Sequence, residues 1–320
     1  MEKTSDSGFP FCFWVFKQDI WSPEVRRALK EAGIAEISIE PSAFMPEKYT
    51  RDDVRRLRAI LDEDGLSVST AHPPFGSFNQ RFSLLRQSPT GLIEDLAYMK
   101  EFILRCAILG VKAIPLHTGG AMLPDSRPWE IACAHRYVEA LMPTAQEHGV
   151  VIAIENTNHA TAVGFYEGLE EDVPLNLNIW KFDDTDRILD FVRSFHSPFV
   201  KVCYDTGHSH LLGKMLEDYE AFRDEIVLLH LHDNDGAGSD AHLQPGYGNS
   251  DWKTLFENIK RMKRTPILFV EAQPRYDDLR LFVREMQALW ENRVKIKKGD
   301  FLEKDENTAH LSLPEEKKPC

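Results

Sequence analysis

The sequence has no long apolar run, and no stretch approaches the roughly 18 consecutive apolar residues that indicate a transmembrane helix. The most apolar segment near the N-terminus, 9–16, follows an acidic, serine-rich start. It lacks both a basic region before it and a longer apolar core. A secretory signal peptide requires both features. We therefore expect neither a membrane span nor a signal peptide.

Cysteine is scarce, and its spacing argues against two kinds of small stabilised domain. The chain has five cysteines and no C-x-x-C pair: Cys12, Cys106, Cys133, Cys203 and Cys320. Zinc knuckles need closely spaced cysteines, and disulfide frameworks usually show an even number of them. Widely separated thiols suit a reducing compartment, so the sequence predicts a cytoplasmic protein.

Basic residues are outnumbered by acidic ones. Lys and Arg total 38 against 51 Asp and Glu, which gives a formal net charge of −13. Membrane surfaces and nucleic acids are bound mainly through basic patches, so this balance disfavours both partners without excluding a local basic groove. The chain also lacks G-x-G-x-x-G and G-x-x-x-x-G-K-[ST], the glycine-rich loops that hold nucleotide phosphates. A nucleotide-binding fold is therefore disfavoured.

The sequence does contain a regular alternation of strand-like and helix-like segments. Apolar or β-branched runs predict strands at 11–16, 36–39, 66–71, 111–116, 150–154, 199–204, 226–231 and 266–270. Amphipathic stretches predict helices near 23–32, 51–64, 90–109, 128–148, 184–195, 211–222, 252–262 and 277–291. Strict alternation indicates parallel strands joined by helices, and the number of units favours a closed barrel over an open sheet.

The length is compatible with this fold. By length alone, 320 residues could form two domains, but one α/β domain, a (β/α)8 TIM barrel of roughly 250 residues with tails, fits as well. Thr50 with Asp53 marks one helix start, Asp251 marks another, and Gly65 marks a helix end. We assign residues 1–292 to a single barrel domain. Residues 293–320, rich in Lys, Glu and Asp, are predicted to be a flexible tail.

Side chains that can bind metals follow the predicted strands. Six consecutive strands end at His72, His117, Glu155, Asp205, His230 and Glu271. The C-terminal ends of barrel strands meet on one face, where barrel enzymes carry their active sites. Two long connections, 156–183 and 232–250, belong to the same face, and loops of this length are usually functional or disordered. The competing interpretation is that the histidines are hydrogen-bonded core residues and the acids are helix caps.

Three shorter motifs add candidates at that face. Asp205-Thr206-Gly207-His208 puts an acid and a histidine on one turn after a strand. His230 and His232 point to the same side of their strand, because side chains alternate. Asp240-Ala241-His242 lies in the glycine-containing loop before the seventh predicted helix, for which an ordinary turn-rich loop is the alternative.

Together these motifs resemble the xylose isomerase-like TIM barrel superfamily, which includes sugar phosphate isomerases and epimerases and nucleases of the endonuclease IV type. The resemblance covers most of the chain except the tail. It is carried by Ala71-His72-Pro73, Leu116-His117-Thr118-Gly119, Ile154-Glu155-Asn156-Thr157, Tyr204-Asp205-Thr206-Gly207-His208, His230-Leu231-His232-Asp233, Asp240-Ala241-His242 and Val270-Glu271. These motifs are specific for the superfamily but not for one reaction.

The resemblance implies a site for one to three divalent ions. In isomerase-like members, the residues that match Glu155, Asp205, His230 and Glu271 would hold one ion. In endonuclease-like members, a three-zinc cluster would also use the matches of His72, His117, His208, Asp240 and His242. All these positions are filled in this chain. The many histidines favour Zn²⁺ or Mn²⁺ over Mg²⁺, with Co²⁺ as a further option.

The expected reaction is a proton transfer next to a carbonyl group of a small carbohydrate or polyol, that is, isomerisation or epimerisation. A divalent ion polarises the carbonyl, and two carboxylates on opposite sides of the substrate remove one proton and return another. Glu155 and Glu271, three strands apart around the ring, are the expected catalytic pair. His208 and His232 are expected to hydrogen-bond substrate hydroxyl groups.

Other metal-dependent functions stay open. A three-zinc phosphodiesterase acting on apurinic sites in DNA would use every one of these residues. However, the two long loops carry many acids and a single basic residue, Lys181, whereas DNA binding needs phosphate contacts.

A dehydratase acting on a keto-sugar or cyclitol would use the same ion and base, and a non-catalytic barrel that keeps its metal site is a further alternative. We expect no nucleic-acid or membrane partner and leave assembly into a homo-oligomer open.

Overall fold

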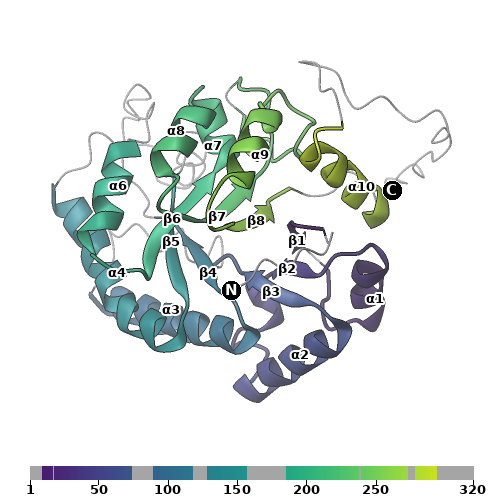
Figure 1. The fold of residues 1–320 in the computed structure, drawn as a ribbon. Coiled ribbons are helices and arrows are strands. Elements are labelled where there is room, and N and C mark those ends of the chain that lie inside the picture. Colours follow the sequence, from purple (N-terminus) through teal and green to yellow (C-terminus); the bar gives the residue numbers. More distant parts are fainter. Residues whose placement is uncertain are drawn as a thin grey trace, which may run out of the picture.

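The strands form a closed parallel barrel. The computed structural model describes residues 9–16, 18–73, 89–117, 128–156, 185–237, 239–272 and 278–293. Neighbouring strands pair in chain order, and β8 pairs with β1 to close the ring (Figure 1). The strands are β1 (Cys12–Val15), β2 (Glu36–Ile39), β3 (Ser67–Thr70), β4 (Ala113–Leu116), β5 (Val151–Glu155), β6 (Val200–Asp205), β7 (Ile226–Leu231) and β8 (Ile267–Val270). The predicted TIM barrel is confirmed.

Helices surround the strands on the outside of the barrel (Figure 1). They are α1 (Pro23–Glu31), α2 (Arg51–Asp64), α3 (Pro89–Leu109), α4 (Pro128–His148), α6 (Thr185–Ser194), α7 (Thr206–Leu211), α8 (Met215–Phe222), α9 (Trp252–Lys260) and α10 (Leu279–Trp290), with a short 3-10 helix η1 (Pro41–Ala43) after β2. Within the described ranges, no helix has the length and apolar character needed to cross a membrane.

Local side-chain chemistry explains where several helices begin and end. Thr50 and Asp53 form a reciprocal capping box at the start of α2, in which each side chain accepts a hydrogen bond from the other residue's backbone N–H. Asp251 caps α9 by accepting a hydrogen bond from the N–H of Thr254. Gly65 ends α2 with a φ of 72°, a left-handed conformation that costs glycine little. The sequence signals at these three boundaries are confirmed.

One predicted helix is wrong in its extent. The sequence pattern predicts a helix over 211–222, whereas α7 begins at Thr206, directly after β6, and α8 begins only at Met215. The Asp205 carboxylate caps α7 by accepting a hydrogen bond from the backbone N–H of His208 at 2.7 Å. Gly213, with a φ of 70°, interrupts the helical path between the two elements. The early start of α7 brings Asp205 and His208 side by side at the end of the barrel.

The inside of the barrel is filled by small and apolar side chains that lie beneath the polar face. The inner cluster is Cys12, Ala113, Ala153, Cys203, Leu228 and Phe269. Side chains two positions apart on a strand share a face. Glu155, Asp205 and His230, two residues beyond Ala153, Cys203 and Leu228, therefore share the inner face at the C-terminal ends of their strands.

Two domain predictions lie largely outside the described residues. The predicted flexible tail, 293–320, is described only at residue 293, and the first long loop, 156–183, only at residue 156. The boundary at residue 292 and the character of the tail therefore stay predictions. The second long loop, 232–250, is described except for residue 238.

Candidate metal centre

Four buried side chains from neighbouring strands meet at the C-terminal end of the barrel. Glu155 ends β5, Asp205 ends β6, His230 lies in β7 and Glu271 directly follows β8. One possible ligand atom from each lies within 4.8 Å of those of the others. His230 Nδ1 is 2.7 Å from Glu271 Oε2, 3.4 Å from Glu155 Oε1 and 3.8 Å from Asp205 Oδ2. We call these four residues the strand-end group.

The charges in the strand-end group depend on one another. Burial alone would raise the pKa of Glu155, but His230 and His117 hold it well below its usual range. Burial would likewise raise the pKa of Glu271, yet His230 lowers it to about 2. Burial would lower the pKa of His230, but Cys203, Glu155 and Glu271 raise it well above its ordinary value. Both glutamates are therefore ionised at neutral pH, the form in which carboxylates bind metals.

A second set of side chains shares Glu155 and lies toward β3 and β4. His117 Nε2 is 3.0 Å from Glu155 Oε2, and the rings of His72 and His117 meet edge to face with centroids 5.2 Å apart. His72 Nδ1 lies 2.8 Å from the carbonyl oxygen of Pro73. Burial, reinforced by His117, lowers the pKa of His72 to about 4. His72 is therefore neutral at physiological pH, which is the metal-binding form of imidazole.

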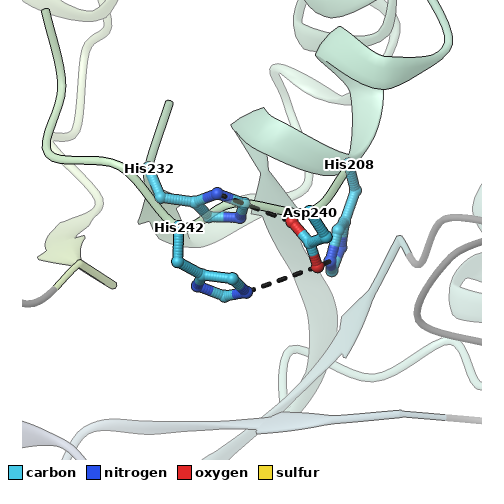
Figure 2. Close-up of side chains that lie close together, drawn as sticks. All are labelled: His208, His232, Asp240 and His242. Atoms are coloured by element: carbon cyan, nitrogen blue, oxygen red, sulfur yellow. Dashed lines mark hydrogen bonds and ion pairs between the residues drawn. The ribbon is translucent and has the colours of Figure 1, made fainter. Parts of the chain in front are cut away.

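A third set gathers around one aspartate of the loop after β7, and we call it the loop group. It consists of His208, His232, Asp240 and His242 (Figure 2). Asp240 Oδ2 lies 3.2 Å from His208 Nε2 and 3.3 Å from His242 Nε2. Burial would lower the pKa of His242, but the hydrogen bond to Asp240 and the nearby carboxylates raise it to about 9. The group is rich in nitrogen atoms, whereas the strand-end group is rich in oxygen atoms.

His232 links the loop group to the strand-end group. Its Nε2 lies 3.0 Å from both carboxylate oxygens of Asp205. The His232 ring stacks on the ring of His242, with centroids 4.0 Å apart and planes 8° apart. Gly207 passes so close that a Cβ atom there would lie 2.0 Å from His232 Cε1. The turn after β6 therefore needs glycine at this position to make room for the imidazole.

Asp233 holds the loop that carries Asp240 and His242. Its fully buried carboxylate accepts hydrogen bonds from the Trp252 indole N–H at 2.7 Å and the Ser250 hydroxyl at 2.6 Å. It also accepts bonds from backbone N–H groups further along the loop, those of Gly246 and Gly248, both at 2.9 Å. The sequence analysis did not select Asp233. Its only signal is an acid placed between a strand end and a glycine-containing loop.

Asn156 is a second positioning residue that the sequence analysis did not select. Its side-chain oxygen accepts a hydrogen bond from the Asp205 N–H at 2.7 Å, and its amide nitrogen donates to the Asp205 carbonyl at 3.0 Å. His208 Nδ1 lies 2.8 Å from the Asn156 carbonyl oxygen. Asn156 thus fixes the end of β6 to the end of β5 and sets the direction of the His208 ring.

A pocket of about 740 Å³ adjoins these groups on the side of β1 and β2. Its wall is formed by Trp14, Phe16, Glu40, Pro41, Ser42, His72, Pro73, Ala241, His242 and Glu271. The Trp14 indole N–H donates to Glu40 at 2.9 Å. Among these lining residues there is no Lys or Arg. The volume suits a small molecule, since ligand pockets commonly measure about 300–1,000 Å³.

The structure brings all the predicted metal-binding residues into these three overlapping groups. Of the predicted catalytic pair, Glu271 lines the pocket, whereas Glu155 is not among its lining residues. His208 and His232, predicted to bind substrate hydroxyls, are 3% and 0% exposed and do not line the pocket either. The catalytic and substrate-binding roles of these residues stay predictions.

Fold and site together define a class of protein: a parallel barrel with candidate metal ligands at the C-terminal ends of its strands. The chain belongs to the xylose isomerase-like TIM barrel family, whose model matches residues 26–291. The uncharacterized protein y4fM of Sinorhizobium fredii is 41% identical over 305 residues, which are 86% of this chain and 90% of that protein. A Mesoplasma florum protein named "Probable endonuclease 4" is 27% identical over 201 residues, 57% of this chain and 61% of its own length. The match thus spans less than two thirds of that second relative.

Solved structures with the same fold are distant in sequence. The structure of 3-keto-D-glucoside 4-epimerase YcjR from E. coli has a TM-score of 0.64 and 17% identity, and the match covers 88% of this chain and 99% of that one. The structure of the IOLI protein with a bound zinc atom has a TM-score of 0.62 and 16% identity, with 88% and 98% covered. At these identities the similarity establishes the fold alone.

Proposed function

We propose that this protein is a divalent-metal-dependent isomerase or epimerase that transfers a proton next to a carbonyl group of a small carbohydrate or polyol. The observation that carries the proposal is the composition of the pocket wall. Glu271 of the strand-end group lies in the same wall as the aromatic rings of Trp14 and Phe16 and the carboxylate of Glu40. Aromatic faces and carboxylates can contact the C–H faces and hydroxyl groups of a sugar, whereas a polyanion would need cations.

The residues of the strand-end group fit a divalent ion. Its three carboxylates are buried together, and no lysine or arginine is among the ion-pair partners of these three acids in the described part of the chain. Clustering like charges away from water is costly unless a cation joins them. We propose Glu155, Asp205, His230 and Glu271 as its ligands, with Zn²⁺ or Mn²⁺ favoured and Mg²⁺ or Co²⁺ as alternatives. The zinc atom in the structure of the IOLI protein supports metal binding by a protein of this fold.

The protein's own groups would divide the work of proton transfer. A bound divalent ion would polarise the substrate carbonyl. Glu271 would accept the proton from the carbon next to that carbonyl, and its ionised form and its position in the pocket wall support this role. Glu155 accepts a hydrogen bond from His117 Nε2 at 3.0 Å, so this pair can hold the proton that is returned. The epimerase activity named for YcjR supports a reaction of this class on this fold.

One observation favours a second function, that of a phosphodiesterase of the endonuclease IV type. The structure gathers all nine residues that such a three-zinc cluster would need, including His72, His117 and Asp240. The relatives named "Probable endonuclease 4", at 27% and 25% identity, support the same alternative. The pocket wall argues against it because the described lining residues offer no cation to a phosphate.

Exchange of substrate protons with solvent tests the proposal directly. The metal-loaded full-length protein is incubated in D₂O with unphosphorylated and phosphorylated ketohexoses, 3-keto-glycosides and keto-cyclitols, and deuterium at the carbon next to the carbonyl is followed by NMR. We expect exchange with at least one compound. Glu155→Gln and Glu271→Gln should each lower its rate by about 10²- to 10⁴-fold, the usual contribution of general acid–base catalysis.

The controls separate the alternatives. Glu225→Gln makes the same change at the N-terminal side of β7, beside Lys201, and should leave the exchange rate unchanged. Loss of water from the substrate would indicate a dehydratase. No exchange with any compound, together with incision of a duplex containing an abasic site, would show that the phosphodiesterase is the right assignment.

A further inference from the structure

We propose that His232 is itself a metal ligand. Through Nδ1 it completes, with His208, Asp240 and His242, a second site that has four protein ligands and no position left for substrate. The family resemblance implies only the other three residues as ligands, and the sequence analysis gave His232 to the substrate. The proposal concerns metal binding alone and does not depend on which reaction the protein catalyses.

The first argument is a buried nitrogen atom without a hydrogen bond. His232 is fully buried, and its Nδ1 has no hydrogen-bond partner among the residues that the structure describes. Asp240 Oδ1 lies 3.8 Å away from it, too far for a hydrogen bond. A buried polar atom left unpaired costs about 1–3 kcal/mol. An ion between His232 Nδ1 and Asp240 would give this nitrogen a partner.

The second argument is the direction of the ring protons in all three histidines. His232 Nε2 lies 3.0 Å from the Asp205 carboxylate, His208 Nδ1 lies 2.8 Å from the Asn156 carbonyl, and His242 Nδ1 lies 2.9 Å from the Glu271 carbonyl. Each of these oxygens is an acceptor, so each of these nitrogens donates its N–H.

The opposite nitrogen of each ring is then the one that can bind a metal once it carries no proton. In the neutral rings these are His208 Nε2, His232 Nδ1 and His242 Nε2, and all three lie beside Asp240 (Figure 2). Without an ion, protons on His208 Nε2 and His242 Nε2 join these nitrogens to Asp240, and a metal ion would take the place of those protons. An imidazole that donates one N–H to a carbonyl or carboxylate and binds metal through the other nitrogen is the usual arrangement of metal-binding histidines.

The stacking of the His232 and His242 rings indicates that one of them must turn before both can bind the same ion. His232 and His242 lie parallel, so their lone pairs run side by side and do not converge. The side chain of His242 is 37% exposed, whereas His232 is enclosed by Gly207 and tied to Asp205. We therefore expect His242 to turn toward the ion while His232 stays in place.

Four protein ligands give this site a structural role. A tetrahedral zinc ion with four protein ligands has no open position, whereas a catalytic ion keeps one for water or substrate. An ion held by His208 and His232 on one side and by Asp240 and His242 on the other would fasten loop 232–250 to the end of the barrel. The strand-end group also supplies four protein ligands, but its oxygen-rich set suits an octahedral ion with two further positions, and Glu271 lines the pocket from which substrate would reach them.

Cadmium NMR of the full-length protein tests the proposal, because the chemical shift of bound cadmium separates nitrogen-rich from oxygen-rich ligand sets. The wild-type protein should show at least one resonance of each kind, and a resonance that His72→Asn removes belongs to the set around His117 and is left out of the comparison. His232→Asn should displace only the nitrogen-rich resonance and weaken metal binding there by at least about tenfold. His210→Asn, the same change two residues beyond His208 on α7, should move neither resonance.

Three outcomes would overturn the proposal. The first is a single resonance in the wild-type protein, a result that needs no variant. The second is a nitrogen-rich resonance that His232→Asn leaves in place. The third is movement of the oxygen-rich resonance alone, which would show that His232 acts only by positioning Asp205. His232→Gln provides a second variant if the asparagine protein does not fold by circular dichroism. Substrate turnover is not measured, so failure here is distinct from failure of the proposed reaction.

Discussion

The strand-end group and the loop group lie next to each other but are built differently. The strand-end group has three carboxylates and one imidazole, all on strand ends that the barrel hydrogen bonds hold in register. The loop group has three imidazoles and one carboxylate, and three of its residues come from loop 232–250, which Asp233 anchors. Oxygen-rich sites suit hard divalent ions, and histidine-rich sites suit zinc. The comparison shows that one end of a barrel can carry two chemically different sites side by side. Residues close in sequence, such as Asp205 and His208, belong to different sites.

The largest expected effect is a difference in activity between matched acid-to-amide changes in the two groups. Asp205→Asn removes a carboxylate from the strand-end group, and Asp240→Asn does so in the loop group. Because polarisation by an ion contributes several kcal/mol to such reactions, Asp205→Asn should lower turnover by about 10³-fold. Asp240→Asn should lower it less than about tenfold, the low end for residues that act through a ligand.

The measurement is solvent deuterium exchange at saturating zinc or manganese, with the compound that the wild-type protein exchanges fastest. Stoichiometry by elemental analysis accompanies it, so that loss of an ion is separated from loss of chemistry. Equal losses in the two variants would contradict the division into a reactive and a structural group.

A smaller effect is expected from the loop anchor. The Asp233 carboxylate accepts hydrogen bonds from several donors. Asp233→Asn replaces one of its oxygen atoms with an NH₂ group, which is itself a donor and cannot accept them. Hydrogen bonds to a charged group contribute about 1.5–3 kcal/mol each, and the amide oxygen can keep some of them, so we expect a loss of about 2–4 kcal/mol. With an unfolding entropy of about 2 cal/mol/K per residue, the melting temperature should fall by about 3–6 °C.

Metal binding by this variant tests whether the loop group and the strand-end group are independent sites. The nitrogen-rich cadmium resonance should weaken in Asp233→Asn, whereas the oxygen-rich resonance should persist, because no ligand of the strand-end group lies on the anchored loop. Asp235→Asn, at an exposed position of the same loop, should change neither the melting temperature nor the resonances. Loss of both resonances in Asp233→Asn would show that the two groups cannot be separated.

Hydrophobic patterning predicts the barrel well, because the spacing of apolar residues in each strand and helix indicates which side of that element is buried. It also locates Glu155, Asp205 and His230, since the end of a buried run marks the end of a strand. Their division into groups could not be predicted, because it depends on the path of loop 232–250. That path is set by hydrogen bonds to Asp233, and a single acid has no periodic signal. The break between α7 and α8 was missed for a similar reason, since it rests on one conformation at Gly213 and one cap at Asp205.

The smallest expected effect lies in the pocket wall, away from both groups. Trp14→Phe keeps an aromatic face but removes the N–H that donates to Glu40 at 2.9 Å. One hydrogen bond contributes about 0.5–1.5 kcal/mol, so KM should rise about two- to tenfold. The turnover number should stay unchanged, because the role proposed for this pocket wall is to bind substrate and transition state equally. Trp290→Phe, in the outer core against Phe11 and Phe256, is the matched control and should leave KM unchanged. A fall in turnover with Trp14→Phe would place this wall in the transition state, and the reactive part of the molecule would then extend from the strand-end group across to β1.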